Sequence, residues 1–283
     1  MSVDPILSVV ILTRDEEANL SYCLESLRGL NADVHIVDSG STDRTLEIAK
    51  SYGAKVYFRT FDNHARQFNW AIDHLPIRTE WCMRMDADEI LLPGLVEELK
   101  EKLPRAKRPL NGFVMNRRMY FWGRWIRHGG FYPMWMVRIW RTGSGRCEDR
   151  WMDEHMIIKE GVVERLANDF VDENHKDLTF WTQKHNLYAN REAIDRMTAE
   201  KAGPEAHLTD RESILRRKFK SDLYCKLPLF IRPVIYWAYR YIVRLGFLDG
   251  VPGLVFHFLH ACWYQFLIDA KIYEAKKNKS RKN

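Results

Sequence analysis

The first sixty residues alternate short apolar runs with helical patterns, and this alternation constrains the fold of the chain most. The first run, from Leu7 to Leu12, is continuous and rich in β-branched residues, as expected of a strand buried on both faces of a parallel sheet. Further strands are predicted over residues 32–37 and 55–58, and helices over residues 20–27 and 44–52. Strands and helices in this order form right-handed β-α-β crossovers, so the sequence predicts an α/β fold with helices on both faces of the sheet.

Polar clusters follow three of the predicted strands at the point where each strand ends. They are Thr13 to Glu16, Asp38 to Asp43, and Asp86 to Asp88, the last of them after the apolar-framed stretch from Glu80 to Met85. In parallel sheets, ligands bind beyond the carboxyl ends of the strands. The three clusters therefore predict a ligand site at this edge of the sheet.

Asp86-Ala87-Asp88 contains two carboxylates one residue apart. Such a pair can bind a divalent cation that in turn holds a diphosphate, because Mg²⁺ and Mn²⁺ prefer oxygen ligands and keep positions open for phosphate oxygens. The triplet alone also occurs in ordinary solvated loops, so the prediction of a metal site depends on the strand before it.

Three motifs stand in the order and spacing of a known family. They are Ser-Val-Val-Ile-Leu-Thr-Arg-Asp-Glu from Ser8, Val-Asp-Ser-Gly-Ser-Thr-Asp from Val37, and Asp-Ala-Asp-Glu from Asp86. Over residues 6–92 they resemble the nucleotide-sugar half of the family 2 inverting glycosyltransferases. The resemblance implies a GT-A-type, mostly parallel central sheet flanked by helices, to which this chain adds a C-terminal amphipathic helical extension.

The resemblance continues more loosely beyond residue 92. Residues 127–133, the region of Glu154, and His175 with Lys184 and Tyr188 resemble the bacterial branch that builds lipopolysaccharide core and related cell-surface glycans. The Gln-x-x-Arg-Trp signature of processive polysaccharide synthases does not occur in the sequence. The resemblance therefore implies the addition of one sugar rather than polymerisation.

By the same resemblance, the first two clusters form a nucleotide pocket. Thr13, Arg14 and Glu16 would line the pocket after the first strand. Asp38 would accept the imide hydrogen of a uracil base, with Ser39 beside it. The expected donor is thus a nucleotide sugar, in particular a UDP-sugar.

The diphosphate and the metal have their own expected residues. Arg66 offers a planar fork suited to a phosphate, although an exposed surface arginine is the alternative. Asp88 would bind Mn²⁺ or Mg²⁺ directly, and Asp86 would contact the metal, its bound water or the ribose. Asp43 either binds ligand or only caps the following helix, and Glu89 is expected as an ordinary charge that opens a helix after Asp88.

Inverting transfer is a direct displacement at the anomeric carbon, and it needs a base for the acceptor hydroxyl. The resemblance favours Glu154, with Asp153 as a close rival, because the family often has Glu-Asp where this chain has Asp-Glu. A pair of acidic residues that begins a helix is the alternative. His155 and His175 could orient acceptor or phosphate, and the histidines lack the paired spacing of a zinc site.

The middle of the chain is rich in aromatic residues, which can stack on the apolar faces of sugars. Trp122, Trp135 and the pair Gly129-Gly130 are the candidate acceptor residues. Core packing explains aromatic residues equally well.

Two apolar stretches, residues 227–248 and 251–268, dominate the last third. In the first, helical spacing separates three arginines from a stripe of aliphatic and aromatic residues; these are Arg232, Arg240 and Arg244 against Ile231, Ile235, Tyr239 and Ile242. The second stretch lies at the lower length limit for a membrane span. Both stretches are predicted as interfacial amphipathic helices, with a helical hairpin in a soluble core, or a dimer interface in a homo-oligomer, as alternatives.

Charge and cysteine usage indicate the cellular compartment and the kind of surface that the chain contacts. Residues 271–283 hold six basic residues and one acidic residue, a net charge of +5, whereas the whole chain carries +6. A basic tail suits an anionic inner leaflet, and the nearly neutral remainder argues against nucleic acid binding. Five scattered cysteines indicate a reducing cytosol, and no secretory signal is expected at the N-terminus.

These observations together predict a cytoplasmic, membrane-peripheral, metal-dependent glycosyltransferase that moves a hexose to a glycolipid or lipid-linked acceptor. Residues 1–110 would bind the donor, residues 111–205 would bind the acceptor and carry the base, and residues 206–283 would associate with membrane. The alternatives are a transferase for a soluble glycan or protein acceptor, a non-catalytic scaffold that binds nucleotide sugar, and a nucleotidyltransferase. The last would need a glycine-rich triphosphate loop, which the sequence lacks.

Overall fold

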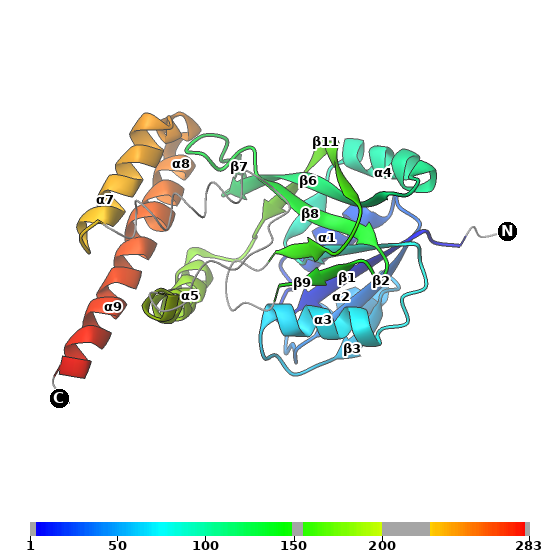
Figure 1. Ribbon diagram of the computed structural model, residues 1–283, viewed down its shortest axis with the longest axis horizontal. Coiled ribbons are helices and arrows are strands. Elements are labelled where there is room, and N and C mark those ends of the chain that lie inside the picture. Colours follow the sequence, from blue (N-terminus) through cyan, green and yellow to red (C-terminus); the bar gives the residue numbers. More distant parts are fainter. Residues whose placement is uncertain (1–3, 149–154, 200–226, 281–283) are drawn as a thin grey trace. The chain divides into compact units, whose positions relative to one another are not determined.

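The computed structural model describes residues 4–148, 155–199 and 227–280 of the chain. The chain divides into two compact units. Unit 1 comprises Met1–Tyr120 and Pro133–His175, and unit 2 comprises Phe121–Tyr132 and Lys176–Asn283. Figure 1 shows unit 1 mainly in blue to green, and the helices of unit 2 in yellow-green to red.

Unit 1 is built on one large sheet with strands in the order β3-β2-β1-β4-β8-β6-β11-β5. The strands are β1 (Leu7–Thr13), β2 (Ala32–Asp38), β3 (Lys55–Phe58), β4 (Trp81–Asp86), β5 (Glu89–Leu91), β6 (Leu110–Phe121), β8 (Trp135–Arg141) and β11 (Val162–Glu173). The first four are parallel neighbours, and β8 joins this parallel half to the pair β6 and β11 through antiparallel contacts on both sides. A small second sheet pairs β9 (Gly145–Cys147) with β10 (Met156–Ile158).

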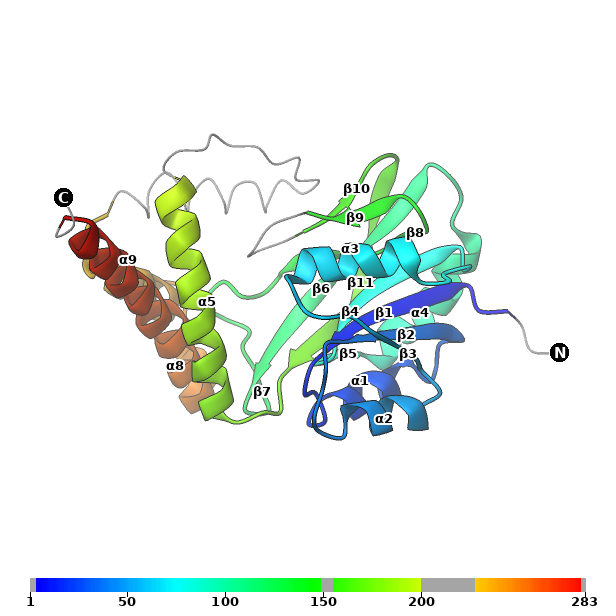
Figure 2. The same ribbon diagram turned by 90° about the horizontal axis from the view of Figure 1, so that it is seen from below.

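Helices cover both faces of this sheet (Figure 2). They are α1 (Leu20–Leu27), α2 (Thr45–Ser51), α3 (His64–His74) and α4 (Pro93–Arg105). Residues of α1, α2 and α4 join one buried cluster, and residues of α3 join another. The predicted α/β fold, with its strands over residues 7–12, 32–37 and 55–58 and the helices between them, is confirmed.

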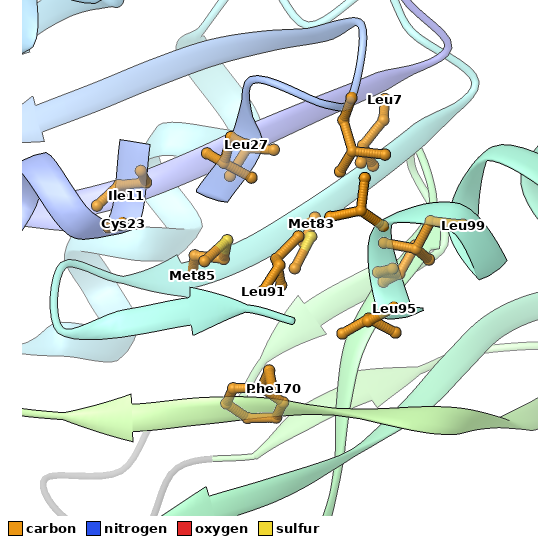
Figure 3. Close-up of a cluster of buried hydrophobic side chains, with 14 of the residues drawn as sticks. Leu7, Ile11, Cys23, Leu27, Met83, Met85, Leu91, Leu95, Leu99 and Phe170 are labelled. Atoms are coloured by element: carbon orange, nitrogen blue, oxygen red, sulfur yellow. The ribbon is translucent and has the colours of Figure 1, made fainter. Parts of the chain in front are cut away.

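Successive side chains of β1 point to opposite faces of the sheet, and both faces are covered, so its sequence is continuously apolar. Leu7, Val9 and Ile11 pack into the cluster with α1 and α4, whereas Val10 packs into the cluster with α3. Figure 3 shows Leu7 and Ile11 in the first cluster, among side chains of β4, β5, α4 and β11. Full burial of such a side chain stabilises the fold by about 1.5–3 kcal/mol, so both faces of β1 contribute.

The described residues of unit 2 form helices and the short strand β7 (Arg124–Trp125). Its helices are α5 (Leu178–Ala199), α7 (Ile231–Ala238), α8 (Gly250–His257) and α9 (Tyr264–Ser280). A π-helical turn, Tyr239–Val243, extends α7, and another, Phe258–Trp263, joins α8 to α9. We call residues 231–269 the C-terminal hairpin, since they form two helical arms that turn at Leu245, a residue with positive φ. Ala189 and Ala193 of α5 pack against Tyr264, Ile268 and Ile272 of α9.

Candidate active site

The ends of β1 and β2 meet at Asp38. In the parallel register Thr13 lies beside Asp38, and Leu12 lies beside Asp86 of β4, so the three polar clusters share one edge of the sheet as predicted. Asp38 is only 2 % exposed. Its Oδ2 accepts hydrogen bonds from the hydroxyls of Thr13 (2.9 Å) and Ser41, and its Oδ1 accepts from the backbone N–H groups of Gly40 and Ser41, both at 2.8 Å.

The loops after β1 and β2 also bind each other. The N–H of Glu16 donates to Thr45 Oγ1 (2.7 Å), and the N–H of Glu17 donates to Asp43 Oδ2 (3.0 Å). The other oxygen of Asp43 accepts from the N–H of Thr45 (2.9 Å), the first residue of α2. Asp43 therefore has the capping role that the sequence suggested as one of two, because its carboxylate serves a backbone N–H at the start of α2.

The N-terminus of α3 adds residues to this edge. Asn63 caps the helix by accepting the backbone N–H of Arg66 (2.7 Å), and Arg66 is exposed in the first turn. One turn along, the side-chain N–H of Gln67 donates to Ser39 Oγ (2.7 Å). This hydrogen bond joins α3 to the loop after β2, so Ser39 and Arg66 lie in connected segments.

The Asp86-Ala87-Asp88 turn connects β4 to β5 in the same unit. Two arginines contact Asp86: Arg138 of β8 donates to its Oδ2 (3.3 Å), and Arg84 lies 3.5 Å from its Oδ1. Burial alone would raise the pKa of Asp86, but the charges of Arg84 and Arg138, together with His64 of α3, outweigh it and hold the pKa below its ordinary value. The Asp86 side chain is still 41 % exposed, so it presents a charged carboxylate.

Asp88 is held by the end of β11. Its backbone carbonyl accepts the N–H of Glu173 (2.9 Å), and its Oδ2 accepts from the side chain of Asn174 (2.9 Å). The next residue, His175, donates its N–H to Asn19 Oδ1 (2.8 Å), and its ring lies 4.4 Å from the ring of Tyr22. The structure thus brings His175 to the same edge as Asp88.

Glu89 corrects the sequence prediction. It does not open a helix: it begins the short strand β5, and the next helix, α4, begins at Pro93. Its buried carboxylate pairs with buried Arg138 and accepts the N–H of Asp86 (2.9 Å). Burial, with the nearby charges of Asp86 and Asp172, raises the pKa of Glu89 against the opposing charge of Arg138. The sequence did not indicate this burial, because a buried carboxylate needs a partner such as Arg138, which comes from a distant strand.

Sequence reasoning did not single out Ser41, Arg84 or Arg138. A usable signal existed for Arg138, which interrupts the apolar strand Trp135–Arg141. A charge inside such a strand needs a buried partner of opposite sign. No comparable signal marks Asn174, which reaches Asp88 across 86 residues of sequence.

The candidate acceptor residues divide between the two units. Trp135 lies half-buried in β8, with the guanidinium of Arg165 4.8 Å above its ring. Trp122, Gly129 and Gly130 belong to unit 2, where Trp122 is 54 % exposed.

Asp153 and Glu154, the candidate bases, lie outside the described residues. The residues that flank this segment are paired: the N–H of Glu148 donates to the carbonyl of His155 (2.9 Å). His155 Nδ1 also lies 4.0 Å from Glu148 Oε2.

Asp86 and Asp88 are the residues that could hold a metal ion. In the part of the chain that the structure describes, no group of three or more His, Cys, Asp or Glu side chains is arranged to bind one. A cation that also binds substrate phosphates needs only one or two carboxylates from the protein. The pair therefore fits a metal that arrives with, or is completed by, a diphosphate.

Comparison with known proteins identifies the class. Residues 8–149, half of the chain, match the sequence model of glycosyl transferase family 2. The chain therefore belongs to this family and is a glycosyltransferase. Its central sheet and helices have the GT-A fold that the motifs predicted.

Individual relatives and neighbours are consistent with this assignment. The chain is 29 % identical over 287 residues to the lipopolysaccharide core biosynthesis glycosyltransferase LpsC of Rhizobium meliloti (strain 1021), covering 98 % of this chain and 95 % of LpsC. It is 33 % identical over 94 residues to the uncharacterized glycosyltransferase RT0209 of Rickettsia typhi, covering 33 % of this chain and 32 % of the relative. A mannosyltransferase of Pyrobaculum calidifontis, solved with GDP-Man and Mn²⁺, has the same fold with a TM-score of 0.56 and 12 % identity, covering 96 % of this chain and 88 % of that one.

Proposed function

We propose that this glycosyltransferase transfers one hexose, with inversion, from a UDP-sugar to a lipopolysaccharide-type or other lipid-linked acceptor at the cytoplasmic face of the membrane. The observation that carries the proposal is the shared edge of Thr13, Asp38 and the Asp86-Ala87-Asp88 turn. Ligands of parallel α/β sheets bind at this edge. The near full-length similarity to LpsC supports a lipopolysaccharide-type acceptor.

Asp88 and Asp86 would hold Mn²⁺ or Mg²⁺, and the bound ion would neutralise charge on the leaving diphosphate. The chain prepares this site by keeping Asp86 ionised beside Arg84 and Arg138. Asn174 fixes one oxygen of Asp88. The presence of Mn²⁺ and GDP-Man in the mannosyltransferase of the same fold agrees with a metal and a nucleotide sugar here.

The nucleotide would lie against the loops after β1 and β2. Thr13, Arg14 and Glu16 would line its pocket, and Ser39 would lie beside its base. A carboxylate offers about four acceptor positions, and in Asp38 the chain itself uses four. The imide N–H of uracil would therefore replace one hydroxyl donor on Asp38, and Arg66 would bind the diphosphate.

The base would be Glu154 or Asp153, and it would take the proton of the acceptor hydroxyl. His155, His175, Trp122, Trp135 and the Gly129-Gly130 pair would contact the acceptor. In this proposal residues 1–110 bind the donor, residues 111–205 bind the acceptor and supply the base, and residues 206–283 associate with the membrane.

The test is the release of UDP from a panel of UDP-sugars with Mn²⁺ or Mg²⁺, together with direct Mn²⁺ binding measured by electron paramagnetic resonance in the presence of UDP. Asp88→Ala should lower both turnover and Mn²⁺ affinity by about 100-fold or more, because it removes a metal ligand. The matched control is Asp73→Ala, which removes an exposed carboxylate that pairs with Arg146 at the surface. Equal Mn²⁺ affinity in wild type and Asp88→Ala would contradict the metal assignment.

The same panel separates the alternatives. A scaffold would bind UDP with metal but would show no turnover. Replacing Glu154 or Asp153 by alanine would not change its UDP binding. A transferase for soluble acceptors would keep full activity when the residues after Lys218 are removed. A nucleotidyltransferase would consume nucleoside triphosphates instead of nucleotide sugars.

A further inference from the structure

The C-terminal hairpin, residues 231–269, buries its charges. Four of its five charged side chains are buried: Arg232, Arg240, Asp249 and Asp269, each no more than 8 % exposed. Arg232 pairs with Asp269, donating from Nε at 2.9 and 3.0 Å. This buried ion pair joins the two helical arms, in addition to ring contacts such as that of Trp237 with Phe258.

Many large apolar side chains of this segment and of the residues just after it are exposed instead. Of the 21 exposed large hydrophobic side chains among the described residues, 14 lie between residues 231 and 273. These are Ile231, Val234, Ile235, Tyr239, Ile242, Val243, Leu245, Phe247, Leu248, Val251, Leu254, Phe258, Phe266 and Tyr273. Each would gain roughly 1 kcal/mol by leaving water, so this surface is out of place in an aqueous setting.

Helical spacing makes this surface continuous along the first arm. Ile231, Ile235, Tyr239 and Ile242 recur every three or four residues and are 54, 47, 40 and 58 % exposed. The opposite stripe begins with Arg232 and reaches Arg240, whose guanidinium faces the ring of Phe131 at 3.7 Å. Of the predicted arginine stripe, the structure buries Arg232 and Arg240 and leaves the third member, Arg244, exposed.

Basic residues accompany the apolar surface. Arg244 is the exposed charge of the hairpin, and the remainder of α9, from Lys271 to Lys279, carries four lysines and one glutamate, a net charge of +3. Near an anionic membrane each basic residue contributes about 1 kcal/mol. An apolar helical face with cations at its ends has the composition of a segment that lies within the headgroup layer.

We propose that the exposed apolar face of residues 231–273 docks on an anionic phospholipid bilayer and lies in the plane of its headgroup layer. The helix Gly246–Lys279 is long and apolar enough to cross a membrane by length and composition alone. It contains Gln265 and Asp269, and one of its sides packs on α5. In-plane docking keeps these contacts, whereas a span would expose the polar groups to lipid.

Docking would carry a second segment to the membrane. Within unit 2, the N–H of His128 donates to Asp249 Oδ2 (3.0 Å), the N–H of Gly129 donates to the carbonyl of Arg244 (2.9 Å), and Arg240 Nε donates to the carbonyl of Gly129 (2.6 Å). Residues 121–132, with exposed Trp122, are thus fixed to the hairpin. If the proposed function holds, this segment receives the acceptor at the lipid surface; the docking itself does not depend on that function.

The experiment is sedimentation of the full-length protein with vesicles of phosphatidylcholine, with and without added phosphatidylglycerol, in the absence of nucleotide. Wild type should bind the anionic vesicles at least about tenfold more tightly than vesicles of phosphatidylcholine alone. Salt should weaken this binding by screening the charges. Ile235→Glu/Ile242→Glu should lower binding at least about tenfold, because two carboxylates would enter the bilayer surface. The matched control, Val162→Glu, changes a similarly exposed apolar residue of unit 1 and should leave binding unchanged.

Several results would overturn the proposal. They are no binding of wild type to anionic vesicles, equal binding by the double variant, and a wild-type dimer that the double variant converts to monomer, which would assign the face to a second copy of the chain. If circular dichroism shows that the double variant is unfolded, Val251→Glu replaces it, since Val251 is 69 % exposed at the start of α8, where a carboxylate suits the helix. UDP release by the same variants is a separate readout, so failure of docking and failure of the proposed transferase reaction are distinguishable.

Discussion

Arg138 contacts two acidic residues, Asp86 in the candidate metal turn and Glu89 directly after it. It pairs with buried Glu89 and also contacts Asp86, while Glu89 accepts the backbone N–H of Asp86. The turn is therefore closed by a pair of buried charges that reach it from β5 and β8. At the scale of single residues, Arg84 and Arg138 both contact Asp86, and their charges hold its pKa below the ordinary value.

Replacing Arg138 by leucine should destabilise the protein by about 1–3 kcal/mol, because Glu89, whose pKa is already raised, would be buried as a neutral carboxyl group without its hydrogen-bond partner. Urea unfolding at neutral pH measures this. The double variant Arg138→Leu/Glu89→Leu should recover more than half of the loss, since it removes the orphaned carboxylate. Additive losses in the double variant would show that the two charges do not stabilise each other.

At the scale of elements, α5 and α9 form the small core of unit 2, and His185 of α5 lies beside it. Its ring stacks on Trp181 at 3.5 Å and meets Tyr264 of α9 edge-on at 5.3 Å. Burial lowers the pKa of His185 to about 4, against an ordinary value of 6.5, although a hydrogen bond to the carbonyl of Trp181 opposes the shift. The stability of this pair of helices should therefore depend on pH.

The direction of this pH dependence follows from the difference in proton binding between the unfolded and the folded chain. Between pH 6.5 and pH 4 the unfolded chain binds more protons at His185 than the folded chain does, so stability is complete above this range and is lost as the pH falls through it. Allowing for partial solvent exposure, the loss should be about 1–3 kcal/mol. His185→Gln should flatten the pH dependence of urea unfolding in this range, whereas His74→Gln, at an exposed position of α3, should not. An unchanged slope in His185→Gln would refute the assignment.

At the scale of the whole molecule, the two units differ in how much apolar surface they bury. Unit 1 holds both large clusters around its sheet, whereas the cluster that α5 and α9 share has five buried members among the described residues. Local stability follows buried contacts. We therefore expect the units to open separately, each with its own free energy.

Hydrogen exchange read by mass spectrometry tests this expectation. Amides of β1 and β4 should exchange at least about tenfold more slowly than those of α5 and α9. Arg138→Leu should speed exchange in β4 and β8 without changing α5 and α9. Equal protection throughout, or a uniform effect of the substitution, would indicate a single cooperative unit.

The parallel half of unit 1 could be predicted because its information is local. The β-branched run of β1 indicates burial on both faces of the sheet. The polar residues after each strand indicate the edge that carries the candidate site. Glu89 and Arg138 could not be paired from sequence, because 49 residues separate them and the antiparallel strand β8 brings them together. Likewise, the burial of Arg232 depends on Asp269, which lies 37 residues away.

The hydrogen bonds of Asp38 have a consequence for how nucleotide specificity can change. The loops after β1 and β2 are already hydrogen-bonded to one another. In the proposed function a nucleotide would therefore bind to preorganised loops, and little conformational entropy would be lost on binding. Preorganised loops bind selectively, but single substitutions in them do not easily change which base they bind. If the proposed UDP-sugar is the donor, a change of preferred base from uracil to guanine would require coordinated substitutions in both loops, and variants with a single substitution would recognise neither base well.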